Sequence, residues 1–226
     1  MTGGQDKALV VLSGGQDSTT CLYWAIDRVG RANVSSITFD YGQKHRIELG
    51  CARNVAAAAG VTNVCLPIDT FAALGGDALT DTSSPVSDEA DEETELPVTF
   101  VPGRNLIFMT FAAAFAYRHD AQHLVTGVAQ TDYSGYPDCR EETMAALQRA
   151  ITLGMDREFT IHTPLMHRSK KETVELAVRL GALDAMALTH TCYNGRRPPC
   201  GECQACRLRA TGFAEAGVSD PLLDIQ

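Results

Sequence analysis

The chain has 226 residues, of which 45% are hydrophobic, and this is enough to bury the core of one substantial domain. Its formal net charge of −9 argues against a nucleic-acid-binding surface. The first residues lack the basic and apolar pattern of a signal peptide, and the longest apolar stretch, 106–117, is too short to span a bilayer. We therefore expect a cytoplasmic protein with neither a nucleic-acid nor a membrane partner.

A strand, a tight turn and a helix are predicted close to the N-terminus. An apolar run over 8–12 is typical of a short buried strand, and a helical pattern extends over 17–28. The glycines and hydroxyl residues between them would present backbone N–H groups and the positive end of the helix dipole to a phosphate. The predicted nucleotide-binding residues are Leu12, Ser13, Gly14, Gly15, Gln16, Asp17, Ser18, Thr19, Thr20, Cys21 and Leu22. Among these, Ser13, Asp17 and Ser18 are predicted to be catalytic.

This turn differs from two common phosphate-binding loops. The Walker A pattern GxxxxGK[ST] and the dinucleotide pattern GxGxxG are both absent from it. A Walker A lysine holds the phosphates during transfer of the terminal phosphoryl group, and no lysine follows these glycines. We therefore expect cleavage of ATP at the α-phosphate, which yields an adenylated substrate and pyrophosphate. The alternative is an ordinary Gly-Gly turn in an α/β protein.

Strands and helices alternate along the remainder of the main domain. Further strands are predicted over 33–39, 61–68, 122–126 and 158–164, and helices over 106–118, 139–153 and 169–180. This alternation predicts an α/β fold with a doubly wound, mainly parallel five-stranded sheet over residues 1–187. The acidic segment 77–97 shows no apolar periodicity and is predicted to be a mobile loop, either a lid or a disordered insertion.

Polar and aromatic residues follow the predicted second and fourth strands, where open α/β sheets bind their ligands. After the second strand, Asp40 is predicted to contact the nucleotide, and Tyr41 and Gln43 the substrate; the alternative is a solvated loop. Gly127, also a predicted nucleotide contact, begins the loop after the fourth strand. This loop combines tyrosines with carboxylates, which suits the binding of a flat, hydrogen-bonding heterocycle. The candidate substrate residues in this loop are Thr131, Asp132, Tyr133, Tyr136 and Asp138, of which Asp132 or Asp138 could accept hydrogen bonds from a guanine-like edge.

Two cations at predicted helix starts are candidates for phosphate contacts. Gly103 and Arg104 lead into the apolar helix, where the guanidinium can fork onto a phosphate. Lys170 lies in the first turn of a helix for which Ser169 and Glu172 predict a capping box. The helix dipole disfavours a cation there, and a bound anion would relieve that cost. We predict that Arg104 and Lys170 are catalytic; the alternatives are an arginine in a surface turn and a solvent-exposed lysine.

Four cysteines near the C-terminus form a second motif. Cys192, Cys200, Cys203 and Cys206 follow the spacing C-x7-C-x2-C-x2-C. Four thiolates at this density favour a closed, tetrahedral, structural zinc site. An iron–sulfur cluster is the main alternative, since closely spaced cysteines also bind iron. We predict a small helical zinc-binding module over 188–226.

The combination of these motifs resembles the 7-cyano-7-deazaguanine synthase family of queuosine biosynthesis, within the PP-loop ATP pyrophosphatases. The Ser-Gly-Gly-Gln-Asp-Ser loop alone is shared by many enzymes. The segment Asp-Tyr-Ser-Gly-Tyr-Pro-Asp-Cys-Arg and the four cysteines are much more specific. The matching segments are 12–22, 38–45, 99–105, 126–140, 163–166, Lys170 and 191–206.

This resemblance implies a Rossmann-like PP-loop fold with strand order 3-2-1-4-5. It also implies ATP-dependent conversion of 7-carboxy-7-deazaguanine and ammonia to the nitrile, through an adenylated acid and an amide. ATP would bind with Mg²⁺, the loop from Ser13 to Thr19 would hold the departing pyrophosphate, and Lys170 and Arg104 would offset developing charge. The family further implies one zinc ion per chain and a homodimer.

Other functions are compatible with the same motifs. A tRNA-modifying thiolase or lysidine-type ligase of the PP-loop class would need a basic RNA-binding surface or an added domain, which the acidic charge disfavours. A non-catalytic, zinc-stabilised nucleotide sensor would not need the complete phosphate loop. An enzyme of the same class could also transfer the activated acid to a protein amine instead of ammonia.

Overall fold

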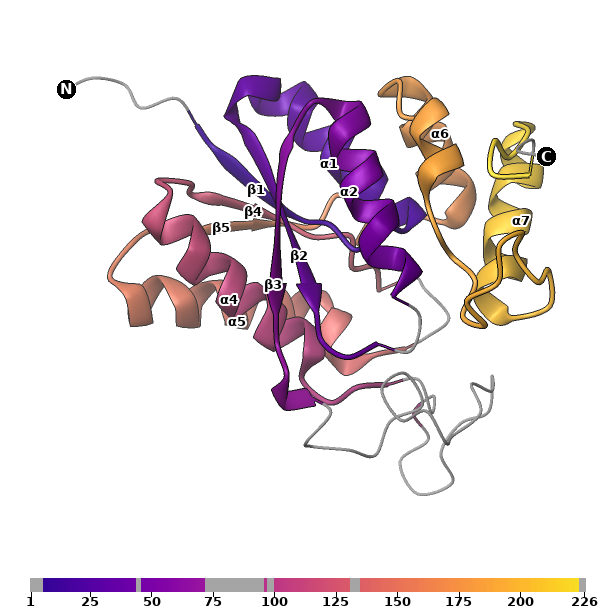
Figure 1. The fold of residues 1–226 in the computed structure, drawn as a ribbon. Coiled ribbons are helices and arrows are strands. Elements are labelled where there is room, and N and C mark those ends of the chain that lie inside the picture. Colours follow the sequence, from indigo (N-terminus) through magenta and orange to yellow (C-terminus); the bar gives the residue numbers. More distant parts are fainter. Residues whose placement is uncertain (1–5, 44–45, 72–95, 97–99, 131–134, 224–226) are drawn as a thin grey trace.

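The computed structural model describes residues 6–43, 46–71, 96, 100–130 and 135–223. Its five strands form one parallel sheet in the order β3-β2-β1-β4-β5, as Figure 1 shows. The strands are β1 (Ala8–Val11), β2 (Val34–Asp40), β3 (Thr62–Pro67), β4 (His123–Val125) and β5 (Thr160–His162). The expected strand order is therefore confirmed, and the order reverses between β1 and β4.

Helices cover both faces of the sheet (Figure 1). On one face lie α1 (Gln16–Val29) and α2 (Ile47–Ala59), and on the other lie α4 (Arg104–Arg118) and α5 (Glu141–Met155). Beyond α1 lie α6 (Lys170–Arg179) and then α7 (Gln204–Ala216), next to the C-terminus. Short 3₁₀ turns connect some of these elements, at Arg31–Asn33, Pro137–Cys139 and Asp184–Leu188.

The central strand shows why the chain forms layers. Successive side chains of a strand point to opposite faces of the sheet. Leu9 therefore packs into the cluster that contains Met109 of α4, whereas Val10 packs with Leu22 of α1 and Val55 of α2. Leu9 and Val10 are fully buried on opposite faces of β1, as a parallel sheet covered by helices requires.

A third apolar cluster joins α6 to α7. It includes Val174 and Ala177 of α6, Met186 of the 3₁₀ turn at Asp184–Leu188, and Phe213 of α7. Gly212 allows the two helices to approach closely, because a Cβ atom at this position would lie 2.9 Å from the Cβ of Lys170. The position of Lys170 is therefore coupled to the packing of the C-terminal helix.

The predicted element boundaries needed small corrections. The helix predicted over 106–118 begins two residues earlier, at Arg104, because Asp138 Oδ2 accepts the Asn105 N–H in its first turn at 2.9 Å. The helix predicted over 139–153 begins at Glu141, after a separate 3₁₀ turn at Pro137–Cys139. The predicted capping box of α6 is confirmed, with Ser169 and Glu172 bonded to each other's backbone N–H groups.

Two further sequence predictions concern the acidic loop and the absence of a membrane-spanning helix. The acidic loop expected over 77–97 lies outside the described residues, apart from Leu96. Within the described ranges, every helix is too short or too polar to cross a membrane.

Candidate active site

A cavity of about 340 Å³ opens at the carboxyl end of the sheet, where the strand order reverses. The residues that follow β1, β2 and β4 form its floor, and α4, α6 and α7 contribute walls. Open α/β sheets bind ligands at this reversal, because the loops after neighbouring strands diverge there. The volume is within the range of small-molecule sites.

The loop between β1 and α1 is closed by its own hydroxyl groups. Ser13 Oγ lies 3.1 Å from Ser18 Oγ, and the Ser18 hydroxyl donates to the Gly15 carbonyl at 3.1 Å. The Thr19 hydroxyl donates to the same carbonyl at 2.8 Å. These bonds hold a compact turn whose backbone leads directly into the N-terminus of α1, at Gln16.

Two buried polar atoms of this loop have no hydrogen-bond partner among the described residues: Gln16 Nε2 and Asp17 Oδ1. An unsatisfied buried donor or acceptor costs about 1–3 kcal/mol. A bound anion would satisfy the amide donor, and a bound cation would satisfy the carboxylate oxygen. Both residues line the cavity, so the loop fits a phosphate group accompanied by a metal ion.

Gly14 lets this loop lie against α2. Its backbone has φ +87°, and a Cβ atom here would lie 2.5 Å from the Glu48 carbonyl oxygen and 2.7 Å from the Ala52 nitrogen. Its own carbonyl accepts a hydrogen bond from the His190 N–H at 2.9 Å. The turn is therefore fixed between the first turn of α2 and the segment that precedes the cysteine cluster.

We expect Gly14→Ala to lower the free energy of unfolding by at least about 2 kcal/mol, because a left-handed backbone with a Cβ costs about 1–2 kcal/mol before any clash. ATP turnover should fall with it, since the loop must move away from α2. Chemical denaturation and a turnover assay measure both effects. Gly50→Ala is the matched control: it lies in α2 with open space around it, and should change stability by less than about 1 kcal/mol. Equal stability of the two variants would contradict this interpretation.

Lys170 reaches the same loop from α6. Its Nζ donates to Asp17 Oδ2 at 2.8 Å, and both side chains are largely buried. The negative charge expected near this first-turn lysine is thus supplied by Asp17 in the structure. Gly127 completes the contact on the β4 side, since a Cβ atom there would lie 3.1 Å from the Ser18 nitrogen.

Aromatic side chains form the opposite wall. Phe39 and Phe108 stack with ring centroids 4.6 Å apart, and Tyr41 lies 5.3 Å from Phe108. The Arg104 guanidinium lies 5.7 Å from the centre of the Tyr41 ring and donates to its hydroxyl at 3.3 Å. This wall offers flat apolar surfaces next to a cation, and Tyr136 also lines it.

The sequence-predicted site residues differ in where the structure places them. Those that line the cavity are Leu12, Ser13, Gly15, Gln16, Asp17, Ser18, Tyr41, Gln43, Arg104, Gly127, Tyr136 and Lys170. Thr19, Thr20, Cys21 and Leu22 are fully buried in α1 and support the loop from behind. Asp40 pairs with Arg46, and Asp138 caps α4, so neither lines the described cavity. Gly103 is the N-cap residue of α4. Thr131, Asp132 and Tyr133 lie outside the described residues.

Sequence reasoning missed several residues that line the cavity. Glu48 enters from the first turn of α2, and His190, Tyr193 and Gln204 enter from either side of the cysteine ligands. Burial raises the pKa of Glu48 to about 7, although the positive charge of Arg104 acts to lower it. The closeness of His190 and Tyr193 to Cys192 in the chain is the signal that could have found them.

The four predicted cysteine ligands come together beside α7. All four Sγ atoms lie within 4.8 Å of one another, and those of Cys200 and Cys206 are 3.9 Å apart. Tetrahedral metal–sulfur bonds of about 2.3 Å place the sulfurs about 3.8 Å apart, so the cluster has the geometry to hold one metal ion. The Cys203 and Glu202 N–H groups donate to Cys200 Sγ and lower the pKa of this thiol to about 6.

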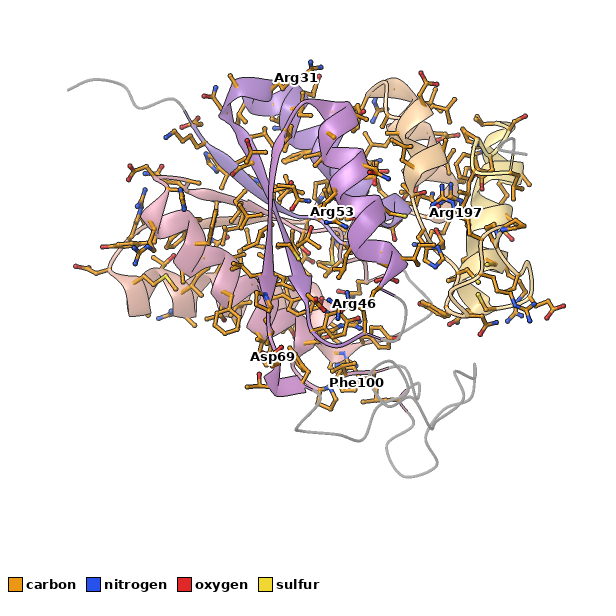
Figure 2. All side chains as sticks on the ribbon, in the orientation of Figure 1. Arg31, Arg46, Arg53, Asp69, Phe100 and Arg197 are labelled. Carbon is orange, nitrogen blue, oxygen red and sulfur yellow. The ribbon has the colours of Figure 1, made fainter. Side chains whose placement is uncertain are left out.

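Buried polar contacts fix this segment to the rest of the chain. Arg209 is almost fully buried and binds both carboxylate oxygens of Asp220, at 2.6 and 2.7 Å, as well as the Thr189 and Thr191 hydroxyls. Arg197, labelled in Figure 2, donates to Cys51 Sγ of α2 at 3.3 Å and to the Ala187 carbonyl. The segment that carries the cysteines is therefore a wall of the cavity.

We expect Arg209→Met to lower the free energy of unfolding by about 3–5 kcal/mol, because it leaves the Asp220 carboxylate buried without its partner. Denaturant unfolding measures this loss. The double variant Arg209→Met, Asp220→Leu removes the unpaired charge and should recover a large part of it. Equal stability of the single and double variants would show that the ion pair is not responsible.

Together, the parallel sheet, the glycine loop at its strand-order reversal and the charged cavity define an α/β protein of the PP-loop class. Comparison with known proteins then gives the family. Residues 7–217 match the model described as Queuosine biosynthesis protein QueC, and the chain belongs to this family. The resemblance predicted from the sequence is thereby confirmed.

Individual relatives are similar over almost their whole length. The chain is 66% identical to 7-cyano-7-deazaguanine synthase of Chromobacterium violaceum over 219 residues, which are 97% of this chain and 94% of that protein. It is 62% identical to the protein of the same name from Laribacter hongkongensis, covering 97% and 95% of the two chains. Among solved structures, a predicted subunit of tRNA methyltransferase from Methanocaldococcus jannaschii matches with a TM-score of 0.49 and 17% identity, over 76% of this chain and 74% of that one.

Proposed function

We propose that this chain converts 7-carboxy-7-deazaguanine and ammonia into 7-cyano-7-deazaguanine, with ATP as the activating substrate. The observation that carries the proposal is the pair of unsatisfied buried atoms in the loop, Gln16 Nε2 and Asp17 Oδ1, at a cavity whose far wall is aromatic. The names of the relatives supply the product, and the sequence resemblance implies 7-carboxy-7-deazaguanine and ammonia as the substrates.

The phosphates of ATP would lie on the loop after β1. The α1 N-terminus, the Gln16 amide and Lys170 provide donors and positive charge on one side of the cavity. Mg²⁺ at Asp17 Oδ1 would neutralise the charge of the phosphates. When the substrate carboxylate attacks the α-phosphorus, these groups stabilise the charge that develops on the departing pyrophosphate.

The deazapurine would lie against the aromatic wall. Tyr41, Phe108 and Tyr136 supply flat surfaces, and Arg104 supplies a cation that suits a carboxylate substrate. Thr131, Asp132 and Tyr133 remain candidates for recognition of the base edge. Asp138 is buried and its Oδ2 already accepts the Asn105 N–H, so the base edge would have to use the remaining acceptor capacity of this carboxylate.

The chemistry requires two activations. Adenylation gives the carboxylate a leaving group; ammonia then forms the C–N bond, and the C–O bond to AMP breaks to give the amide. Adenylation of the amide oxygen, followed by loss of AMP, gives the nitrile, and both protons of the amide nitrogen are released in the process. We also propose that zinc occupies the cysteine cluster, where it would hold His190, Tyr193 and α7 against the cavity.

A direct assay tests this function. The metal-loaded protein is incubated with 7-carboxy-7-deazaguanine, ATP, Mg²⁺ and ammonium, and products are followed by mass spectrometry. The expected products are the nitrile, AMP and pyrophosphate, with no nitrile when ATP or ammonium is omitted. Absence of nitrile from the complete mixture would overturn the proposal.

A further inference from the structure

A second carboxylate lines the cavity outside the phosphate loop. Of the described residues that line it, Asp17 and Glu48 are the acidic ones. Asp17 is paired with Lys170 at 2.8 Å. Among the described residues, no hydrogen bond or ion pair within 4.0 Å involves the Glu48 side chain, although this residue is half-buried. A half-buried carboxylate in a ligand cavity without a committed partner is available for chemistry.

Glu48 is held close to the place where the acid is activated. Its backbone carbonyl would lie 2.5 Å from a Cβ atom at Gly14, so the first turn of α2 is pressed against the phosphate loop. The Arg104 charge acts on its carboxylate from the aromatic wall. Glu48 therefore lies between the two halves of the cavity, the phosphate loop and the aromatic wall.

We propose that Glu48 is the general base that prepares ammonia for attack on the adenylated acid. This inference rests on the proposed function. At neutral pH almost all ammonia is ammonium, which has no lone pair with which to attack. The Glu48 carboxylate attracts this cation and takes one proton from it, so that the neutral nucleophile is generated inside the cavity.

The step balances without another reactant. The nitrogen lone pair forms the bond to the acyl carbon, and the bond from that carbon to the phosphate oxygen breaks, with its electron pair leaving on AMP. Conversion of ammonium and an acyl adenylate to an amide releases two protons, of which one is on Glu48 and the other leaves with AMP. Because burial raises the Glu48 pKa to about 7, this group can both accept a proton and return it to water near neutral pH.

Glu48→Gln tests the proposal, because glutamine keeps the shape of the side chain and cannot accept the proton. The adenylation step alone is measured as the exchange of labelled pyrophosphate into ATP, with the acid present and ammonium absent. This exchange should remain within about threefold of wild type, while nitrile formation from ammonium should fall about 10²-fold. The retained exchange also shows that the variant is folded.

Hydroxylamine provides the second readout, because it is largely unprotonated at neutral pH and needs no base to release its lone pair. In Glu48→Gln, hydroxamate formation from hydroxylamine should stay within about fivefold of wild type. Glu48→Asp, which retains a carboxylate, should recover part of the ammonium reaction. Glu142→Gln is the matched control: Glu142 is exposed in the first turn of α5, and its replacement should change none of these rates.

Three results would overturn the inference. The first is nitrile formation from ammonium by Glu48→Gln at the wild-type rate. The second is loss of exchange in that variant, which would place Glu48 in activation of the acid. The third is loss of the hydroxylamine reaction with exchange intact. If wild-type protein shows neither exchange nor nitrile, the proposed function itself fails, and that outcome is distinct from all three.

Discussion

Asp17→Asn is expected to lower nitrile formation by about 10³-fold or more. Asparagine fills the same space but removes the negative charge from a site where one oxygen binds Lys170 and the other is buried without a partner. Mg²⁺ would lose its ligand, and Lys170 would lose the group that orients it. Steady-state turnover and pyrophosphate exchange should decrease together, because both need the same phosphate loop.

The matched control for this variant is Asp27→Asn, which changes an exposed carboxylate in the same helix and should leave turnover unchanged. Thermal unfolding of Asp17→Asn without ligand separates loss of the ATP site from loss of stability, because removing one partner of a largely buried ion pair also destabilises the fold. Turnover of Asp17→Asn within tenfold of wild type would show that this carboxylate is not part of the ATP site.

Cys203→Ala is expected to abolish metal binding and, with it, catalysis. A structural zinc ion contributes about 10–16 kcal/mol of apparent binding free energy in small zinc domains, and three remaining thiolates cannot complete a closed tetrahedral site. Because Tyr193 and Gln204 line the cavity and directly follow the ligands Cys192 and Cys203, loss of the ion should disorder a wall of the site. Elemental analysis, thermal unfolding and turnover measure the three consequences.

Cys65→Ala is the control for the cysteine series, because Cys65 is exposed on β3 and lies outside the cluster. It should retain the equimolar metal content and the activity of wild type. An absorption spectrum separates the two candidate metals, since an iron–sulfur protein is brown and a zinc protein is colourless. Full activity of Cys203→Ala would contradict a supporting role for the metal site.

Features determined by local sequence could be predicted well. The strand, the glycine turn and the helix follow one another directly in the sequence. Hydrophobic periodicity and the placement of the glycines were therefore enough to predict the turn between β1 and α1. The short spacing of Cys200, Cys203 and Cys206 likewise limits how far apart their thiols can lie. The alternation of strands and helices determined the α/β layers, because each strand must bury both faces.

Features determined by distant segments could not be predicted in the same way. Lys170 and Asp17 are 153 residues apart in the chain, and only the packing of α6 beside α1 brings them within 2.8 Å. Asp138 looked like a ligand for the base, yet it caps a helix 33 residues earlier in the chain. Glu48 had no signal of its own, since an acidic residue in a first helical turn is also typical of simple dipole stabilisation.

The structure also changes the interpretation of the C-terminal segment. The sequence predicted a separate module that is held against the main domain. In the structure, the His190 N–H donates to Gly14, and Gly212 lies against Lys170, so this segment contacts the phosphate loop and one of its candidate catalytic residues directly. We therefore expect the metal site to support the geometry of ATP activation as well as the stability of the fold.

The most direct test of the central claim uses 7-carboxy-7-deazaguanine labelled with oxygen-18 in its carboxylate. Attack of this carboxylate on the α-phosphorus transfers a labelled oxygen to AMP, and adenylation of the amide transfers the other in the second cycle. The AMP isolated from a complete reaction should therefore carry oxygen-18, and inorganic phosphate should carry none. Labelled inorganic phosphate together with ADP would contradict activation at the α-phosphate.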